Sequence, residues 1–164
     1  MRILKVYLDT SVISYLDQQD APEKMLETRK LWSMFQRGQY NVVISDTVIR
    51  EIESCKPDKR KILLGYLEQI DYTLWEVTDE MRDLANKFLA MGFLKQKSHD
   101  DCLHIAAAII TGCDIIVSWN FRHIVNVKTI RGVKILTTME GCKELLIYSP
   151  PVLLANEEDY DEED

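Results

Sequence analysis

Four polar residues stand where they could carry the chemistry of a site: Asp9, Glu51, Asp101 and Asn120. Asp9 and Asn120 each follow a short apolar stretch, Glu51 lies within a helical pattern after another such stretch, and Asp101 begins a helical pattern. Each also has an ordinary explanation. Asp9 and Asp101 can cap helices, Glu51 can be a solvated helix residue, and Asn120 can be a turn residue. Only a fold that brings the four together would favour a site.

Short apolar stretches alternate with amphipathic helical patterns along the chain. We expect strands at residues 3–8, 41–45, 73–77, 114–118 and 133–136, the last followed by a short helix after Thr138. Alternation of this kind is typical of an α/β fold. The sequence therefore predicts a three-layer α/β/α sandwich around a central, mainly parallel sheet.

Such a sheet would bring the four polar residues to one edge, because the carboxyl ends of parallel strands lie side by side. Carboxylates held close together repel one another, and each pKa rises. A hard divalent cation removes that conflict, since Mg²⁺ or Mn²⁺ takes oxygen ligands and often binds a few carboxylates together with a substrate phosphate. The pattern indicates metal-assisted hydrolysis of a phosphodiester.

The excess negative charge of the chain is concentrated at its C-terminal end. The formal net charge is −7, but residues 157–164 hold seven acids and no base, and the remainder has 20 acidic and 20 basic residues. The acidic composition therefore does not exclude a nucleic-acid substrate. We expect one domain over residues 1–148 and an acidic, disordered tail over residues 149–164.

Several other classes of protein find no support in the sequence. No apolar run is long enough to span a membrane, and the chain enters its first strand without a signal segment, so we expect a cytoplasmic protein. No glycine-rich phosphate loop follows any predicted strand, which argues against a dinucleotide-binding domain. The dispersed cysteines indicate reduced thiols rather than a zinc site or disulfides: Cys55, Cys102, Cys113 and Cys142.

Four segments follow one another in the order and at the spacing of a known family: residues 7–13, 45–52, 100–108 and 116–124. Together they resemble the PIN-domain ribonucleases, in particular the VapC-type toxins of bacterial toxin–antitoxin pairs, from residue 3 to about residue 140. The resemblance implies a PIN-like fold with an acidic Mg²⁺ (or Mn²⁺) site that cleaves RNA. It also implies an antitoxin protein as partner and a homodimer.

By position, the resemblance makes Asp9, Glu51 and Asp101 the metal-binding acids. Asp101 fits the third position better than Asp100, because it stands three residues before the His-Ile-Ala-Ala run. Asn120 is a departure, since many PIN nucleases have an aspartate there. An amide can coordinate a cation or position water, but it gives up a charge and cannot act as a base. A site with one metal is therefore easier to defend than a site with two.

The resemblance also places Ser11 or Thr10 beside the first acid, where either would hold water or phosphate. Arg122 would position the substrate. Other basic residues flank the acids and are either phosphate contacts or parts of solvated loops: Lys95, Lys97, His123 and the turn at residues 56–61. His104 lies on an apolar helix face and is expected to be a packed histidine rather than a ligand.

Two hypotheses from different classes remain. The first is a metal-dependent endoribonuclease that acts as the toxin of a toxin–antitoxin pair. The second is a PIN-like module that has lost its chemistry and serves in binding or assembly, with Asn120 as the sign of that loss and the acidic tail as the interacting segment. Cation binding distinguishes them.

Overall fold

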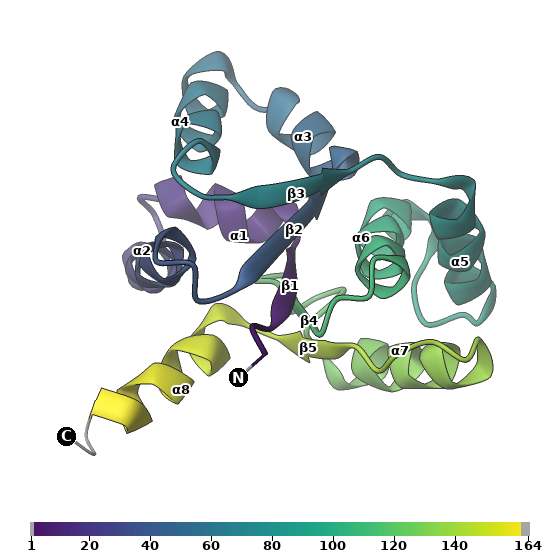
Figure 1. Cartoon of the computed structure of the whole chain (residues 1–164). Coiled ribbons are helices and arrows are strands. Elements are labelled where there is room, and N and C mark those ends of the chain that lie inside the picture. Colours follow the sequence, from purple (N-terminus) through teal and green to yellow (C-terminus); the bar gives the residue numbers. More distant parts are fainter. Residues whose placement is uncertain (1, 162–164) are drawn as a thin grey trace.

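Five parallel strands form one sheet at the centre of the molecule (Figure 1). The computed structural model describes residues 2–161, with side chains to residue 155. The strands stand in the order β3-β2-β1-β4-β5, and their bounds are β1 (Lys5–Leu8), β2 (Asn41–Ser45), β3 (Tyr72–Trp75), β4 (Ile115–Val117) and β5 (Leu146–Tyr148). Every pairing is parallel, which confirms the predicted fold class.

Helices cover both faces of the sheet, with α1, α2 and α4 on one side and α5, α6 and α7 on the other (Figure 1). Their bounds are α1 (Thr10–Ser14), α2 (Pro22–Gln36), α3 (Asp46–Glu53), α4 (Pro57–Leu67), α5 (Asp79–Ala90), α6 (His99–Ile110), α7 (Val127–Met139) and α8 (Pro150–Asp161), with short 3₁₀ helices at Tyr15–Asp17 and Gln96–Ser98. In the part of the chain that the structure describes, none of these helices combines the length and apolar character needed to cross a bilayer.

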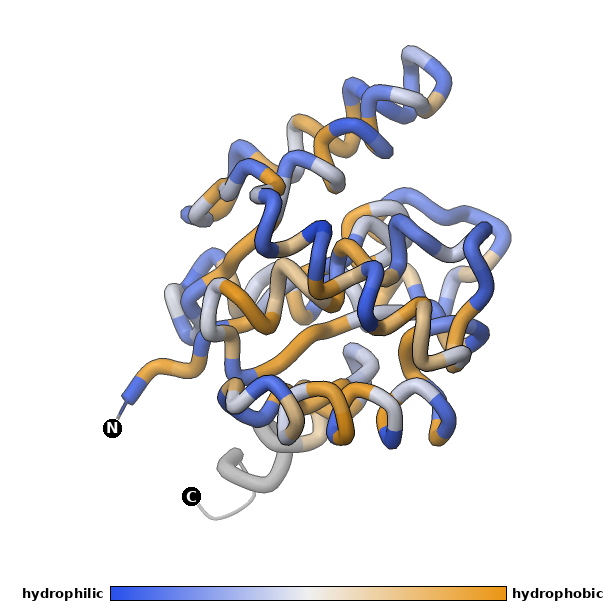
Figure 2. The backbone as a smooth tube through the Cα atoms, turned by 90° about the vertical axis from the view of Figure 1, so that its right-hand side faces the viewer, coloured by the Kyte–Doolittle hydropathy of each residue, from blue (hydrophilic) through white to orange (hydrophobic). Residues whose placement is uncertain are grey.

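The strand β1 lies in the middle of the sheet and is buried on both faces. Tyr7 pairs with Val43 of β2 and with Ile116 of β4, and the side chains of Val6, Tyr7 and Leu8 are fully buried. Figure 2 shows hydrophobic backbone running through the middle of the molecule, with hydrophilic segments toward the outside. Burial on both faces explains why the strand is a continuous apolar run, and it leaves the residue after β1 at the centre of the carboxyl edge.

The strand predicted at residues 133–136 is wrong, because this segment lies inside α7. The side chain of Asn126 caps the helix by accepting a hydrogen bond from the Thr129 N–H at 2.9 Å. Val133 and Leu136 are buried three residues apart, a spacing that suits one helix face. The last strand of the sheet is β5, which lies further along the chain.

Disorder predicted from residue 149 onward is wrong for the start of that segment. The chain enters α8 at Pro150, and proline suits the first turn of a helix. Leu153 is buried in the hydrophobic core, and α8 packs against α2. The acidic side chains of residues 157–164 lie outside the described side chains.

Candidate functional site

Asp9 is a buried carboxylate held by two serine hydroxyls. It follows β1 and is 3% exposed. Ser11 Oγ donates to one of its oxygens at 2.6 Å, and Ser118 Oγ donates to the other at 2.7 Å. Although Asp9 occupies the N-cap position of α1, its side chain makes no capping hydrogen bond. The carboxylate is therefore oriented by β4 and α1 together.

The same two serines tie the end of β4 to the start of α1. Ser11 Oγ accepts a hydrogen bond from the Trp119 N–H at 2.8 Å, and Ser118 Oγ accepts one from the Asn120 N–H at 2.9 Å. Each hydroxyl thus donates to Asp9 and accepts from the backbone of the loop that follows β4. Ser11, expected to hold water or phosphate, is placed where it fixes the first acid.

Burial raises the pKa of Asp9, and the negative charge of Asp101 raises it further. His104 and the hydrogen bonds from Ser11 and Ser118 act in the opposite direction but do not cancel the effect of burial. A buried carboxylate with a raised pKa is one that a nearby positive charge would stabilise in its ionised form. The electrostatics at Asp9 therefore favour a cation.

Glu51 faces the same edge from α3. One of its oxygens accepts a hydrogen bond from Thr10 Oγ1 at 3.0 Å and lies 2.5 Å from His104 Nε2. Burial raises the pKa of Glu51, but the hydrogen bond and charge of His104 outweigh burial, so the pKa is lowered overall. Thr10, expected beside Asp9, is placed against the second acid.

His104 is the residue that sequence reasoning missed. It is buried, as expected for a packed histidine, but both ring nitrogens make polar contacts. Nε2 meets Glu51, and Nδ1 lies 2.7 Å from the Tyr7 hydroxyl, which in turn lies 2.8 Å from Ser45 Oγ. Burial lowers the pKa of His104, but the neighbouring carboxylates raise it more, Glu51 most of all.

Its position in the sequence carried a signal for this role. His104 follows Asp101 by three residues in α6, and residues three apart share one face of a helix. A histidine on the same face as a candidate acid was therefore aimed at the same edge of the sheet.

Asp101 lies in the first turn of α6 and contacts the loop after β4. Its oxygens accept a hydrogen bond from Asn120 Nδ2 at 3.3 Å and lie 3.0 Å from His123 Nδ1. Burial raises the pKa of Asp101, and His104 and His123 only partly oppose that rise. Asp100 points elsewhere and forms an exposed ion pair with Arg50 at 2.8 Å.

Asn120 uses both ends of its amide. Its nitrogen donates to Asp101, and its Oδ1 accepts a hydrogen bond from the His123 N–H at 2.9 Å. The amide therefore helps to orient the Asp101 carboxylate, as Ser11 and Ser118 orient the carboxylate of Asp9. Arg122 lies two residues further along the same loop, and its side chain lines a separate cavity rather than contacting the acids.

The chemistry of these residues fits a hard divalent cation, although they do not form a ready-made cage. Carboxylates and an amide oxygen are the ligands such cations prefer, and the pKa values of Asp9 and Asp101 are both raised. Within residues 2–161, no group of three or more His, Cys, Asp or Glu side chains stands in an arrangement that could hold a metal ion. Protein donors satisfy each carboxylate instead.

Comparisons with known proteins bear on the fold. No protein-family model matches the sequence, and no curated protein matches it significantly. Among solved structures, VapC20 from Mycobacterium tuberculosis, described as a sarcin-ricin loop cleaving toxin, matches with a TM-score of 0.57 at 14% identity, over 73% of this chain and 92% of that chain. VapBC2 from Rickettsia felis, bound to a DNA fragment from their promoter, matches with a TM-score of 0.54 at 12% identity, over 89% and 98%. The chain has the PIN-like fold of VapC toxins, as the resemblance implied.

Proposed function

We propose that this protein is a metal-dependent endoribonuclease that hydrolyses RNA phosphodiester bonds in the cytoplasm, as the toxin of a toxin–antitoxin pair. The observation that carries the proposal is the placement of Asp9. It is a buried carboxylate with a raised pKa, held by Ser11 and Ser118 at the carboxyl end of the central strand. The PIN-like fold shared with a toxin that cleaves the sarcin-ricin loop supports RNA as the substrate class.

In this proposal Asp9, Glu51 and Asp101 hold Mg²⁺ (or Mn²⁺). When bound, the cation supplies a hydroxide from water and neutralises charge on the phosphoryl oxygens. The residues of the chain orient the acids. The two serines hold Asp9, and His104 and Thr10 hold Glu51. Asn120 and His123 hold Asp101 in the absence of the cation.

The proposal is tested with Asp9→Asn, which keeps the size of the side chain and removes its charge. We expect RNA cleavage in Mg²⁺ to fall by at least about 100-fold, with an unchanged circular dichroism spectrum. Asp100→Asn is the matched control, because Asp100 pairs with Arg50 away from the site, and it should keep its activity. Full activity in Asp9→Asn would overturn the assignment of the site.

A second candidate function rests on Asn120 and on the protein donors that satisfy each carboxylate. Here the same fold is a binding or assembly module without catalysis. Calorimetric titration with Mn²⁺ separates the two functions, since a module of this kind binds no cation even at millimolar concentration. The antitoxin and the homodimer belong to the first proposal. Copurification with the product of a neighbouring small gene and sedimentation of the isolated protein test them.

A further inference from the structure

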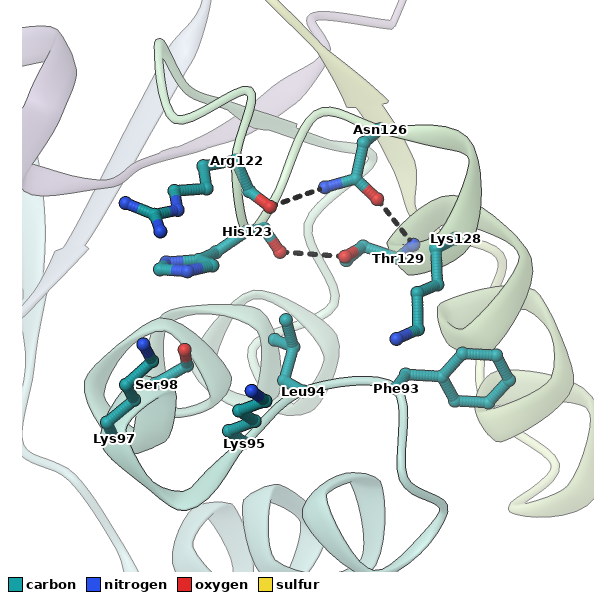
Figure 3. A pocket seen from close by; sticks show the side chains of 10 residues that line it. All are labelled: Phe93, Leu94, Lys95, Lys97, Ser98, Arg122, His123, Asn126, Lys128 and Thr129. Carbon is teal, nitrogen blue, oxygen red and sulfur yellow. Dashed lines mark hydrogen bonds between the residues drawn. The ribbon is translucent and has the colours of Figure 1, made fainter.

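A basic cavity opens next to the acids. It has a volume of about 240 Å³ and lies between the segment that precedes α6 and the loop that leads into α7 (Figure 3). Its basic lining residues are Lys95, Lys97, Arg122, His123 and Lys128, and no Asp or Glu among the described residues lines it. Because like charges repel, a cavity of this composition is stabilised when an anion enters it.

The lysines and the arginine of the cavity are not neutralised by acids of the protein. Within the described side chains, those of Lys95, Lys97, Arg122 and Lys128 make no hydrogen bond or ion pair with the protein. Figure 3 shows Lys95 and Lys128 reaching into the space between the two segments. Lys87, by contrast, pairs with Glu140 at 3.1 Å. An anion would supply the partner that the cavity lacks.

Part of the remaining wall is apolar, and the rest is formed by Ser98, Asn126 and Thr129. Phe93 and Leu94 line the cavity, and the Phe93 ring stacks on Phe88 with centroids 5.9 Å apart. A cationic surface of this kind suits a phosphate group.

His123 joins this cavity to the acids. Its ring lines the cavity, and its Nδ1 lies 3.0 Å from Asp101. The cavity is therefore separated from the third acid by a single side chain. A chain of phosphates that passes Asp101 would bring a neighbouring phosphate to the lysines.

We infer that this cavity binds a phosphate of single-stranded RNA adjacent to the one that is cleaved, and so sets which bond reaches Asp101. The inference rests on the proposed function for its account of cleavage, but binding can be measured without it. Phosphate contacts give affinity that is independent of sequence and sensitive to salt.

The test compares two variants of equal charge. Lys95→Gln/Lys128→Gln removes two cavity lysines, and Lys30→Gln/Lys134→Gln removes two exposed lysines from other helix surfaces. Binding of a fluorescein-labelled octamer of uridylate is followed by anisotropy in EDTA, where metal-dependent cleavage is stopped. We expect the cavity variant to bind about ten-fold more weakly at 0.1 M salt, with the salt dependence reduced by about 0.7 for each phosphate that is no longer neutralised. The control should bind like the unmodified protein.

Equal affinity of the two variants would overturn the proposal that the cavity binds phosphate, because RNA binding would then depend on net charge alone. Cleavage sites on a longer RNA, read in Mg²⁺, give the second readout, and the cavity variant should lose the preferred position. The two proposals fail separately. If the unmodified protein binds RNA through these lysines but never cleaves it, the proposed nuclease activity is refuted. If the cavity variant cleaves RNA at unchanged positions, the proposed role of the cavity is refuted.

Discussion

His104 Nε2 lies 2.5 Å from Glu51 Oε1, and this contact joins α6 to α3 across the carboxyl edge of the sheet. The other ring nitrogen is held by the Tyr7 hydroxyl at 2.7 Å. The imidazole is thus fixed on both sides by groups from different elements. It gives Glu51 a partner that is 2% exposed, while the Glu51 side chain keeps 35% of its surface in contact with solvent.

His104→Ala should lower the free energy of unfolding by about 2 to 3 kcal/mol, because it opens a cavity and removes a polar partner of Glu51 and Tyr7. Urea unfolding measures the change. His99→Ala, at a partly exposed position in the same helix, should stay within about 0.5 kcal/mol of the unmodified protein. Combined with Glu51→Gln, His104→Ala should show a coupling energy of about 1 kcal/mol or more. Strictly additive effects would contradict the pairing.

Asp114 should make stability depend on acidity. Burial opposes its ionisation, but Lys143, the Lys5 N–H and Arg2 bind its carboxylate and lower the pKa of Asp114 to about 2. A folded pKa below the unfolded value means that the ionised group stabilises the fold above about pH 4, and that this contribution is lost between about pH 4 and pH 2. Because solvent screens the exposed side chains of Arg2 and Lys143, the contribution is about 1 to 2 kcal/mol.

The measurement for Asp114 is urea unfolding of Asp114→Asn from pH 6 down to pH 2. The variant should be less stable than the unmodified protein at pH 6, and the two should approach each other as the pH falls. The exposed Asp83 supplies the control, since Asp83→Asn should show no such convergence. A constant gap between Asp114→Asn and the unmodified protein over the whole range would show that the charge of Asp114 is not the cause.

Asn120→Asp should weaken the cation-free fold and strengthen cation binding. The change removes the hydrogen bond to Asp101 and sets a second negative charge against it, while the acceptor for the His123 N–H remains. We expect a loss of about 1 kcal/mol in EDTA and an affinity for Mn²⁺ raised by about ten-fold. Thermal melts with and without Mn²⁺ report both effects. An equal shift of Tm by Mn²⁺ in both proteins would exclude a direct role for position 120 in cation binding.

Gly132→Ala should destabilise the protein although alanine favours helices. A Cβ at this position would lie 2.7 Å from two ring carbons of Phe93 and 3.0 Å from Phe88, and overpacking of this kind costs about 1 to 3 kcal/mol. Gly65→Ala is the control, because a Cβ there meets nothing within 4 Å, and it should gain about 0.5 to 1 kcal/mol. Since Phe93 lines the basic cavity, Gly132→Ala should also change RNA binding there.

The central part of the fold was predictable from the sequence because β1 has a strong local pattern. Its apolar run ends at Asp9, and parallel pairing then requires the ends of β2 and β4 to lie beside it. The segment 133–136 was not predictable in the same way. A short apolar run suits a strand or a buried helix equally, and the cap that decides between them stands earlier in the chain, at Asn126.

The candidate site, like the fold, was predictable only in part. The types and order of Asp9, Glu51 and Asp101 could be read from the sequence, because each stands at an element boundary or within a helical pattern. Their partners could not be read in this way. The contact of His104 with Glu51 joins residues 53 positions apart, and only the packing of α6 against α3 decides which side chains meet.

The place of β1 at the centre of the sheet also has a consequence for synthesis of the chain. Asp9 is made early, but Ser118, which holds it, and Asn120 follow more than a hundred residues later. At the rates at which domains are synthesised, this interval is roughly 5 to 20 s. During that time the growing chain carries the first acid without the strand that completes its setting. Whatever chemistry the acids perform is therefore withheld from the nascent chain until β4 has emerged from the ribosome and paired with β1.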